Sequence, residues 1–430
     1  MTENQDLILI ATVGTGRNRA DIADAIVFSI KRHAPARVVF LCSRKTKDET
    51  LPLVIEKLAW DTQRYQVDVC GDEEDIQRLF IEWNQRWPEW VAGREDAHAI
   101  VDFTSGTKAM SAAVVLLALA RNAAALSYVT GQRDETGRVV RSEETKSFAP
   151  ALIIAHRQLR LAVEHFHAGS YAAARDIAGE YLKIEALPND DLREAARSAY
   201  FIAAAYEAWD RFDYRKAEEF LHQGKTLWTK WSWVDNAATL EDNRELIQQV
   251  RKSTKGVEFL WIALCADLLA NVGRCFVRQA WDDAVARLYR ACEMLAQLKL
   301  WRDYQIKTGD VDPAKIPDPA VRKKYQESKE RLGERKLKLG LGESYELLAE
   351  IKDPLGLQYV HMGGGIAAKG DLFNLLQIRN DSLLAHGTHT IREDKAKALR
   401  QCMVDLARIV DEEGFRAWQA KARPVRFRAF

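Results

Sequence analysis

The stretch ILIATVGTG at residues 8–16, together with DFTSGTKAMSAA at 102–113, decides the fold of the first third of this chain. In each, an apolar β-strand pattern ends in a loop of glycines and hydroxyl residues, after which a helical pattern begins. Further β-branched runs occur at 37–42, 65–70, 98–103 and 125–130. Strands that alternate with amphipathic helices are typical of a parallel sheet with helices on both faces. We therefore expect an α/β domain over residues 1–150.

After Pro150 the β-strand pattern stops and helical periodicity replaces it. Two segments, 161–182 and 205–224, resemble each other: each has a helix, a short turn with an aromatic residue, and an alanine-rich helix. This is the pattern of a helical-hairpin repeat like that of tetratricopeptide proteins. We expect a helical connector over 151–255 and an all-α domain over 256–430.

Composition excludes several classes of protein. The chain has 430 residues with 47% hydrophobic and 29% charged residues, which is typical of a globular protein and not of a disordered one. The formal net charge of +1 indicates no bulk attraction to nucleic acid or membrane, so any basic surface must be local. The longest apolar run, Ala112–Ala120, is too short for a membrane span, which needs about 20 residues.

The cysteines and the N-terminal residues predict a cytoplasmic protein. The first residues, MTENQD, are acidic where a signal peptide would be basic. The six cysteines are scattered, with no close pairing typical of a zinc site, and we expect reduced core thiols: Cys42, Cys70, Cys265, Cys275, Cys292 and Cys402.

A basic run lies within a proline-containing part of the helical region. Residues 321–339, VRKKYQESKERLGERKLKL, carry eight basic and three acidic side chains. Such a run is usually a solvated helix face with i,i+4 ion pairs. Contact with RNA is the alternative.

The loop after the first strand, ATVGTGRNR at 11–19, presents backbone amides and the hydroxyls of Thr12 and Thr15 ahead of a helix, an arrangement that suits an anion. It is a poor dinucleotide fingerprint. Arg19 replaces the third glycine, and no acidic residue ends the second strand, where Cys42 and Ser43 stand.

The loop after the fourth strand combines hydroxyls, a glycine and a lysine at the start of a predicted helix, 107–121: Thr104, Ser105, Gly106, Thr107 and Lys108. It lacks the spacing of a Walker loop. The alternative is an N-capped helix with an ordinary exposed lysine. Because ligands of parallel sheets bind at the carboxyl ends of the strands, the two loops together favour a nucleotide-like ligand.

A third candidate site is IRNDSLLAHG at 378–387, which contains Arg379, Asn380 and His386. We expect one helix that ends at Gly387, with the arginine and the histidine two turns apart on one face. Imidazole can transfer a proton at neutral pH and guanidinium can hold a phosphate, as metal-free RNA cleavage requires. A purely structural role is the alternative; a metal pair of His386 with His389 lacks acidic or cysteine ligands.

These motifs together resemble a known family. The segments 8–16, 102–113 and 126–139 resemble CARF domains, the Rossmann-like sensors of cyclic oligoadenylate in type III CRISPR accessory proteins. The motif at 379–387 resembles that of HEPN ribonucleases, and RLYRACEMLAQLKL at 287–300 is similar to the first long helix of such domains. The resemblance covers both ends of the chain and leaves 151–255 unassigned.

The resemblance implies a CARF sensor at 1–150 and a HEPN ribonuclease at 256–430, active as a metal-independent homodimer on single-stranded RNA in antiviral defence, with no cofactor and no membrane partner. It implies that Arg379 binds phosphate, Asn380 orients and His386 is the catalytic histidine of a composite site. Cyclic oligoadenylate, an allosteric activator, would bind residues at the sheet edge: Thr12, Gly14, Thr15, Gly16, Arg17, Ser43, Thr104, Ser105, Gly106, Thr107 and Lys108.

Two other functions are alternatives to the one that this resemblance implies. A non-enzymatic sensor that signals through its helices is disfavoured by the lack of a basic helix-turn-helix, and a nicotinamide-dependent oxidoreductase by the poor fingerprint. Activator ring size, RNA sequence preference and cleavage of the activator by the sensor stay open. The segment at about 309–370 does not map onto a compact HEPN bundle, which leaves its role in substrate selection open.

Overall fold

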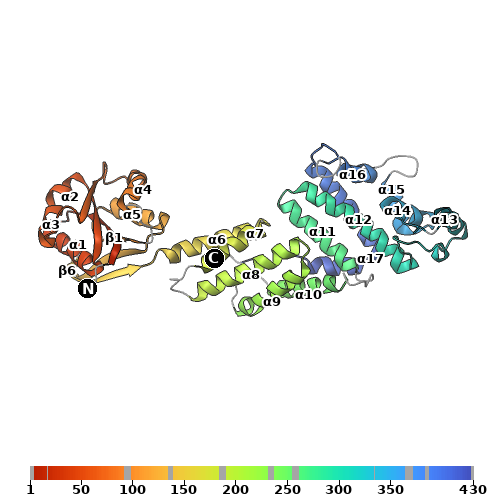
Figure 1. Ribbon diagram of the computed structural model, residues 1–430, viewed down its shortest axis with the longest axis horizontal. Helices are drawn as coiled ribbons and strands as arrows, with labels where there is room; N and C mark the ends of the chain where they lie inside the picture. The colour runs from red at the N-terminus through yellow and green to blue at the C-terminus, as the bar shows by residue number, and fades with distance from the viewer. Residues whose placement is uncertain are drawn as a thin grey trace. The chain divides into compact units, whose positions relative to one another are not determined.

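The computed structural model describes residues 4–16, 18–91, 98–133, 139–183, 190–230, 237–253, 261–333, 335–363, 371–382 and 387–427. The chain forms two compact units, one mainly of residues 1–157 and one mainly of residues 158–430. Figure 1 labels their elements. Each unit is described by itself below.

The first unit contains a six-stranded sheet in the order β3-β2-β1-β4-β5-β6. Its strands are β1 (Asn4–Val13), β2 (Pro35–Cys42), β3 (Tyr65–Val69), β4 (Ala99–Asp102), β5 (Ala125–Arg133) and β6 (Val139–Phe148). The first five are parallel and β6 pairs antiparallel with β5. The predicted α/β domain with a parallel sheet is therefore confirmed, whereas the edge strand β6 was not predicted.

Helices cover both faces of this sheet, as predicted (Figure 1). They are α1 (Arg19–His33), α2 (Arg44–Glu49), α3 (Leu51–Leu58), α4 (Ile76–Val91) and α5 (Lys108–Ala120). One apolar core joins α4 and α5 to the sheet, and a second joins α1 and α3 to the other face. Since β1 lies between β2 and β4, the chain changes direction across the sheet at β1, and the carboxyl ends of β1 and β4 form its topological switch point.

The second unit is all-α in the described residues, as predicted. It begins with α6 (Ala151–His167), whose first residues belong to the first unit, and continues with α7 (Tyr171–Leu182), α8 (Asp190–Asp210), α9 (Tyr214–Lys230) and α10 (Ala237–Ser253). The two predicted hairpin repeats are α6–α7 and α8–α9. Their alanines and aromatic residues share one core with Val425 and Phe427 from the C-terminal segment.

The remaining helices form a second core around α11 (Trp261–Val277) and α12 (Trp281–Tyr304). They are α13 (Pro319–Leu332), α14 (Leu341–Glu350), α15 (Pro354–Met362), α16 (Asp371–Asn380) and α17 (Glu393–Lys421). The proline-containing segment that did not map onto a compact bundle packs against α12: Tyr345 of α14 is fully buried and donates a hydrogen bond to the Cys292 carbonyl at 2.8 Å.

A break divides α17 at Asp411, where φ −164° and ψ 93° are not helical. The Asp411 carboxylate accepts a hydrogen bond from the Gly414 amide at 2.9 Å and so caps the second half of the helix. The carbonyl of Val410 accepts a hydrogen bond from Arg302 at 2.8 Å. Hydrogen bonds from side chains therefore satisfy backbone groups on both sides of the break.

Candidate functional site

The loops that follow β1 and β4 lie against each other at the switch point of the sheet. The Thr12 hydroxyl donates to the Ser105 carbonyl, and the Ser105 hydroxyl donates to the Thr12 carbonyl at 2.6 Å. The Gly14 amide donates to the Ser105 hydroxyl at 3.2 Å. The structure thus brings together the two loops that the sequence singled out separately.

The loops approach so closely that only glycine fits at their contact. A Cβ atom on Gly14 would lie 2.6 Å from the Gly106 backbone nitrogen. Gly106 itself has φ +103°, a conformation that other residues rarely adopt. The glycines of both motifs are therefore needed for the contact between the loops.

Most of the hydroxyls predicted to line a ligand site already have partners within the protein. The Ser43 hydroxyl caps α2 in a capping box with Thr46, and the Thr104 hydroxyl accepts from the Val129 amide at 2.9 Å. The Thr107 hydroxyl donates to the Glu73 carbonyl at 2.6 Å and accepts from the Met110 amide at 3.1 Å, which caps α5. These hydroxyls order the loops.

The groups left for a ligand are fewer. Thr15 is half-buried and Gly16 and Lys108 are exposed, and they lie close to the starts of α1 and α5. Arg17 lies outside the described residues. Helix N-termini and a lysine favour an anion, so this edge of the sheet has the chemistry of a phosphate-binding site.

A buried carboxyl lies beneath this edge and was not predicted. Asp102 ends β4 and is 2% exposed; it accepts hydrogen bonds from the Thr104 amide at 2.9 Å and from the Ser29 hydroxyl of α1. Burial raises the pKa of this carboxyl above its usual range, and His33 nearby opposes the rise. Asp102 therefore links the loop after β4 to α1; the signal in the sequence was an aspartate at the end of the apolar run HAIVDF.

In the second unit, Arg379 lies in the last turn of α16. Its guanidinium lies 5.3 Å from the ring centre of Tyr289 on α12 and donates to the Asn380 side-chain oxygen at 3.2 Å. Arg379 and Asn380, predicted to act together, therefore interact directly. The ring of Tyr289 holds the arginine by a cation–π contact.

The prediction of one helix through Gly387 was wrong. The helix α16 ends at Asn380, and the Gly387 amide donates to the Ser382 carbonyl at 3.0 Å while the His389 amide donates to the Asp381 carbonyl at 3.1 Å. A Cβ atom on Gly387 would lie 2.0 Å from the Asp381 carbonyl oxygen, so the glycine serves a tight return of the chain and not a helix stop.

This return brings residues 387–389 back to the end of α16. The predicted catalytic His386 lies outside the described residues, immediately before Gly387. The expectation that Arg379 and His386 share one face of a continuous helix is wrong, because α16 ends at Asn380.

Two features are absent from the described residues. No group of three or more histidine, cysteine, aspartate or glutamate residues in the ranges given above is placed to hold a metal ion. Among these ranges there is also no helix with the length and apolar character that crossing a membrane requires.

Comparison with known proteins adds one family. Residues 237–410 match the family model described as the Csm6 HEPN domain. A solved structure of Enterococcus italicus Csm6 bound to cyclic hexa-2'-fluoro-hexa-dAMP superposes with a TM-score of 0.49 at 12% identity, covering 96% of this chain and 98% of that chain. No curated protein matches the chain.

Proposed function

We propose that the chain, whose residues 237–410 match the family model described as the Csm6 HEPN domain, is a CARF–HEPN protein and a metal-independent endoribonuclease of type III CRISPR defence. Its substrate is single-stranded RNA, and cyclic oligoadenylate bound by the N-terminal domain activates it. The observation that carries this proposal is that the matched segment contains the whole motif Arg379–Asn380–His386.

The proposed chemistry is attack of the RNA 2′-oxygen on the adjacent phosphorus, which forms a 2′,3′-cyclic phosphate and breaks the bond from phosphorus to the 5′-oxygen. His386 acts as general base for that hydroxyl or as general acid for the leaving 5′-oxygen. Arg379 stabilises the negative charge that develops on the phosphate. Asn380, whose side-chain oxygen accepts from Arg379 at 3.2 Å, orients the guanidinium. Two copies of the chain together form the composite site.

The proposed activator site is the edge of the sheet where the loops after β1 and β4 meet. Lys108, Thr15 and the backbone amides at the helix starts bind the phosphates and riboses of the ring. Because Gly14 and Gly106 are in close contact, both loops contribute to the surface on which the activator binds. Binding of the activator there changes how the two copies of the motif Arg379–Asn380–His386 face each other in the dimer.

The test is cleavage of a single-stranded RNA with and without cyclic tetra- or hexa-adenylate, in EDTA. We expect cleavage only with one of the rings, unaffected by EDTA. His386→Ala should reduce the rate roughly 10²–10⁴-fold, as loss of a general acid or base does. The matched control is His361→Ala, which removes an exposed histidine of α15.

Other outcomes contradict parts of the proposal. Full activity of His386→Ala contradicts the nuclease site. Loss of activity in EDTA, together with inactivity of His389→Ala, favours a metal site that includes His389. Binding of the ring with no RNA cleavage under any condition favours the non-enzymatic sensor.

A second variant tests the role of Arg379. Arg379→Lys keeps the charge but replaces the planar guanidinium with a point charge, so it should not restore the activity that Arg379→Ala loses. Dimerisation, measured by light scattering, should be unchanged in both. Wild-type activity of Arg379→Lys would show that charge alone suffices.

A further inference from the structure

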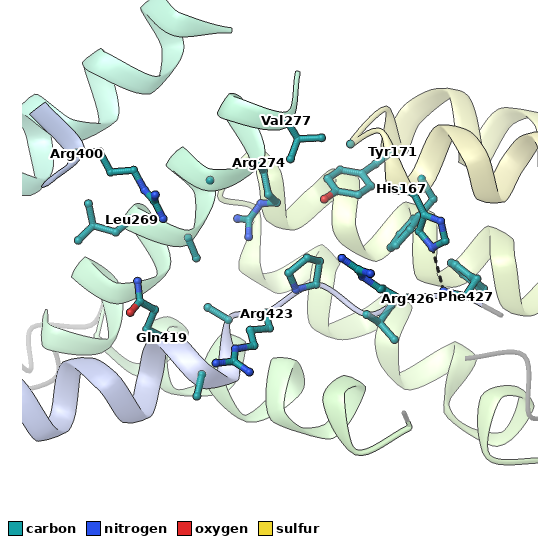
Figure 2. Close-up of a pocket in the computed structure, with 18 of the residues that line it drawn as sticks. His167, Tyr171, Leu269, Arg274, Val277, Arg400, Gln419, Arg423, Arg426 and Phe427 are labelled. Carbon is teal, nitrogen blue, oxygen red and sulfur yellow. Dashed lines mark hydrogen bonds between the residues drawn. The ribbon is translucent and has the colours of Figure 1, made fainter. Parts of the chain in front are cut away.

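The second unit contains a large basic pocket that has no part in the chemistry proposed above. Its volume is about 990 Å³, and it lies between α11, α17, the α6–α7 turn and the segment after α17 (Figure 2). We call it the arginine pocket. None of its lining residues belongs to the motif at 379–389.

The charge of the pocket is of one sign. Its lining includes five arginines and no aspartate or glutamate: Arg274, Arg400, Arg416, Arg423 and Arg426. The side chains of Arg400, Arg423 and Arg426 are exposed and form no ion pair with any residue that the structure describes, whereas Arg416 pairs with Glu412 at 2.6 Å. The three arginines that have no counter-ion among the described residues repel one another, so an anion that binds among them lowers the electrostatic energy.

The central observation is the burial of the Arg274 side chain and the hydrogen bonds that it lacks. Its side chain is 5% exposed, and both terminal nitrogens are buried without a hydrogen-bond partner. Figure 2 shows its guanidinium extending from α11 toward the segment that carries Arg423. A buried donor without a partner costs about 1–3 kcal/mol, more when it is charged, so the hydrogen-bonding capacity of Arg274 is not fully used within the protein.

The nearby carboxylates do not supply these acceptors. Asp210 accepts from the Arg274 Nε at 3.1 Å but also from Arg278 at 2.6 Å. Asp267 accepts from Trp209 and Tyr214 at 2.8 Å each, and its oxygen lies 3.8 Å from the nearest Arg274 terminal nitrogen. The guanidinium is thus held by its bond to Asp210, by the ion pair with Asp267 and by a cation–π contact with Trp209 at 4.8 Å, while its terminal nitrogens make no hydrogen bond.

The other wall of the pocket is apolar and aromatic. Phe166, Tyr171, Leu269 and Val277 line it beside the arginines. A ligand with a phosphate and an apolar ring matches both walls, since guanidinium groups bind phosphate and the apolar wall can contact the ring. A nucleotide within a single strand has both parts.

The segment after α17 is held so that its arginines face this space. The Asn243 side-chain amide donates to the carbonyls of Lys421 at 2.7 Å and Arg423 at 2.8 Å. Further along, the Val425 amide donates to the Tyr206 hydroxyl at 2.8 Å and the Phe427 amide to the His167 ring at 3.0 Å. Arg423 and Arg426 are therefore carried on a fixed backbone.

We propose that the arginine pocket binds a nucleotide phosphate of the single-stranded RNA substrate, away from the bond that is cleaved. The inference rests on the proposed RNase function, which identifies the bound strand as RNA. The binding of a phosphate is inferred from Arg274 and the neighbouring arginines. The pocket thereby adds affinity for RNA without taking part in the chemistry.

The test is the affinity of the full-length wild-type chain and its variants for a single-stranded RNA with methylated 2′-hydroxyls, which cannot be cleaved. Arg423→Gln combined with Arg426→Gln should weaken binding about tenfold. The slope of log affinity against log salt should fall by about 0.7 for each phosphate contact removed. The control is Lys252→Gln, which removes an exposed lysine of α10 that does not line the pocket.

A second variant fills the pocket without changing its charge. A Cβ atom on Gly273 would meet nothing within 4 Å, and Gly273 lines the pocket on α11, so Gly273→Leu should fold normally and still weaken RNA binding. Thermal unfolding checks the fold. Unchanged RNA affinity in both the arginine variant and Gly273→Leu would overturn the proposal.

Competition experiments distinguish a phosphate of RNA from the phosphate of a free nucleotide. Adenosine monophosphate and inorganic phosphate at millimolar concentration should displace RNA weakly, and less from Gly273→Leu. If adenosine monophosphate binds in a manner that depends on Gly273 whereas RNA does not, the pocket takes a free nucleotide and the RNA proposal is wrong. If RNA binding depends on Gly273 but no RNA is cleaved, the pocket proposal holds and the nuclease proposal fails.

Discussion

The sheet edge of the first unit and the arginine pocket of the second unit are both polar, yet they differ in how their hydrogen bonds are used. At the sheet edge, Ser105 and Thr107 have partners within the protein. In the arginine pocket, both terminal nitrogens of Arg274 are buried and make no hydrogen bond. The first arrangement orders a binding surface, and the second leaves binding capacity unused.

The difference shows that residue type alone does not identify the group that binds a ligand. A hydroxyl-rich loop in a sequence has the same composition whether its hydroxyls face a ligand or cap a helix. At the sheet edge the ligand groups are then Lys108, Thr15 and the amides, whereas the hydroxyls set their positions. Four substitutions test this division.

The largest effect should come from separating the two loops of the sheet edge. Gly14→Val places side-chain atoms against the Gly106 backbone, where even a Cβ lies at 2.6 Å. We expect no activation by cyclic oligoadenylate and a loss of about 1–3 kcal/mol in the stability of the first unit, as overpacking causes. RNA cleavage assays and thermal unfolding measure the two effects.

The matched control is Gly309→Val, at a glycine whose Cβ would meet nothing within 4 Å. It should respond to the activator as the wild type does. A Gly14→Val protein with normal activation would show that the contact between the loops is not needed.

Removing a hydroxyl that already has partners should affect stability first. Ser105→Ala leaves the buried Gly14 amide and Thr12 carbonyl without the bonds of 3.2 and 2.6 Å. We expect a loss of about 1–3 kcal/mol in the free energy of unfolding, measured by denaturant titration. Ser111→Ala, which removes only a 3.4 Å contact, is the control and should lose less. Weakened activator affinity at unchanged stability would instead make Ser105 a ligand group.

Lys108→Ala should show the opposite behaviour, because this side chain is exposed. Loss of one charge-assisted hydrogen bond of about 1.5 kcal/mol raises the half-activating concentration roughly tenfold. The maximal rate and the thermal unfolding temperature should not change. Lys31→Ala, in the last turn of α1, removes an exposed lysine at the opposite end of that helix and should have no effect. A lowered maximal rate at unchanged activator affinity would contradict the assignment.

The smallest effect concerns pH. Burial raises the pKa of Asp102, so its protonated form is favoured in the folded state. The stability that this contributes is complete below the pKa of the unfolded chain and is lost as pH rises through the higher folded value. Asp102→Asn should remove this loss and raise the unfolding temperature of the first unit at neutral pH by about 2–4 °C.

The control for this prediction is Asp48→Asn, at an exposed aspartate of α2. Burial also lowers the pKa of His33, which makes the first unit less stable as pH falls, and this opposite trend should persist in Asp102→Asn. An Asp102→Asn protein with the pH profile of the wild type would show that Asp102 is not the titrating group.

The architecture could be predicted because it follows from local periodicity. β-branched runs and amphipathic stretches predicted the five parallel strands and the helical second unit. The edge strand β6 was missed because its sequence, VVRSEETKSF, is polar and charged, as edge strands often are. The end of α16 was mistaken because Gly387 is as typical of a helix stop as of a tight return.

The two sites differ in the same respect: the sequence located the loops at the sheet edge but not the arginine pocket. The loops at 12–16 and 104–108 could be located because parallel strands place their carboxyl ends at one edge. The arginine pocket could not, since Phe166, Arg274 and Arg423 come from distant parts of the chain. No local pattern indicates that Arg274 is buried with terminal nitrogens that make no hydrogen bond, because that depends on where Asp210 and Asp267 lie.

The break in α17 has a mechanical consequence. An unbroken helix of 29 residues would be a stiff rod of about 44 Å. The break at Asp411 makes it two rods, one packed in the core around α11 and α12 and a shorter one that carries Arg416 and Gln419 of the arginine pocket. The two rods need not share one axis, so the shorter rod can line the pocket and place Phe415 in the core while the longer rod keeps its packing against α11 and α12.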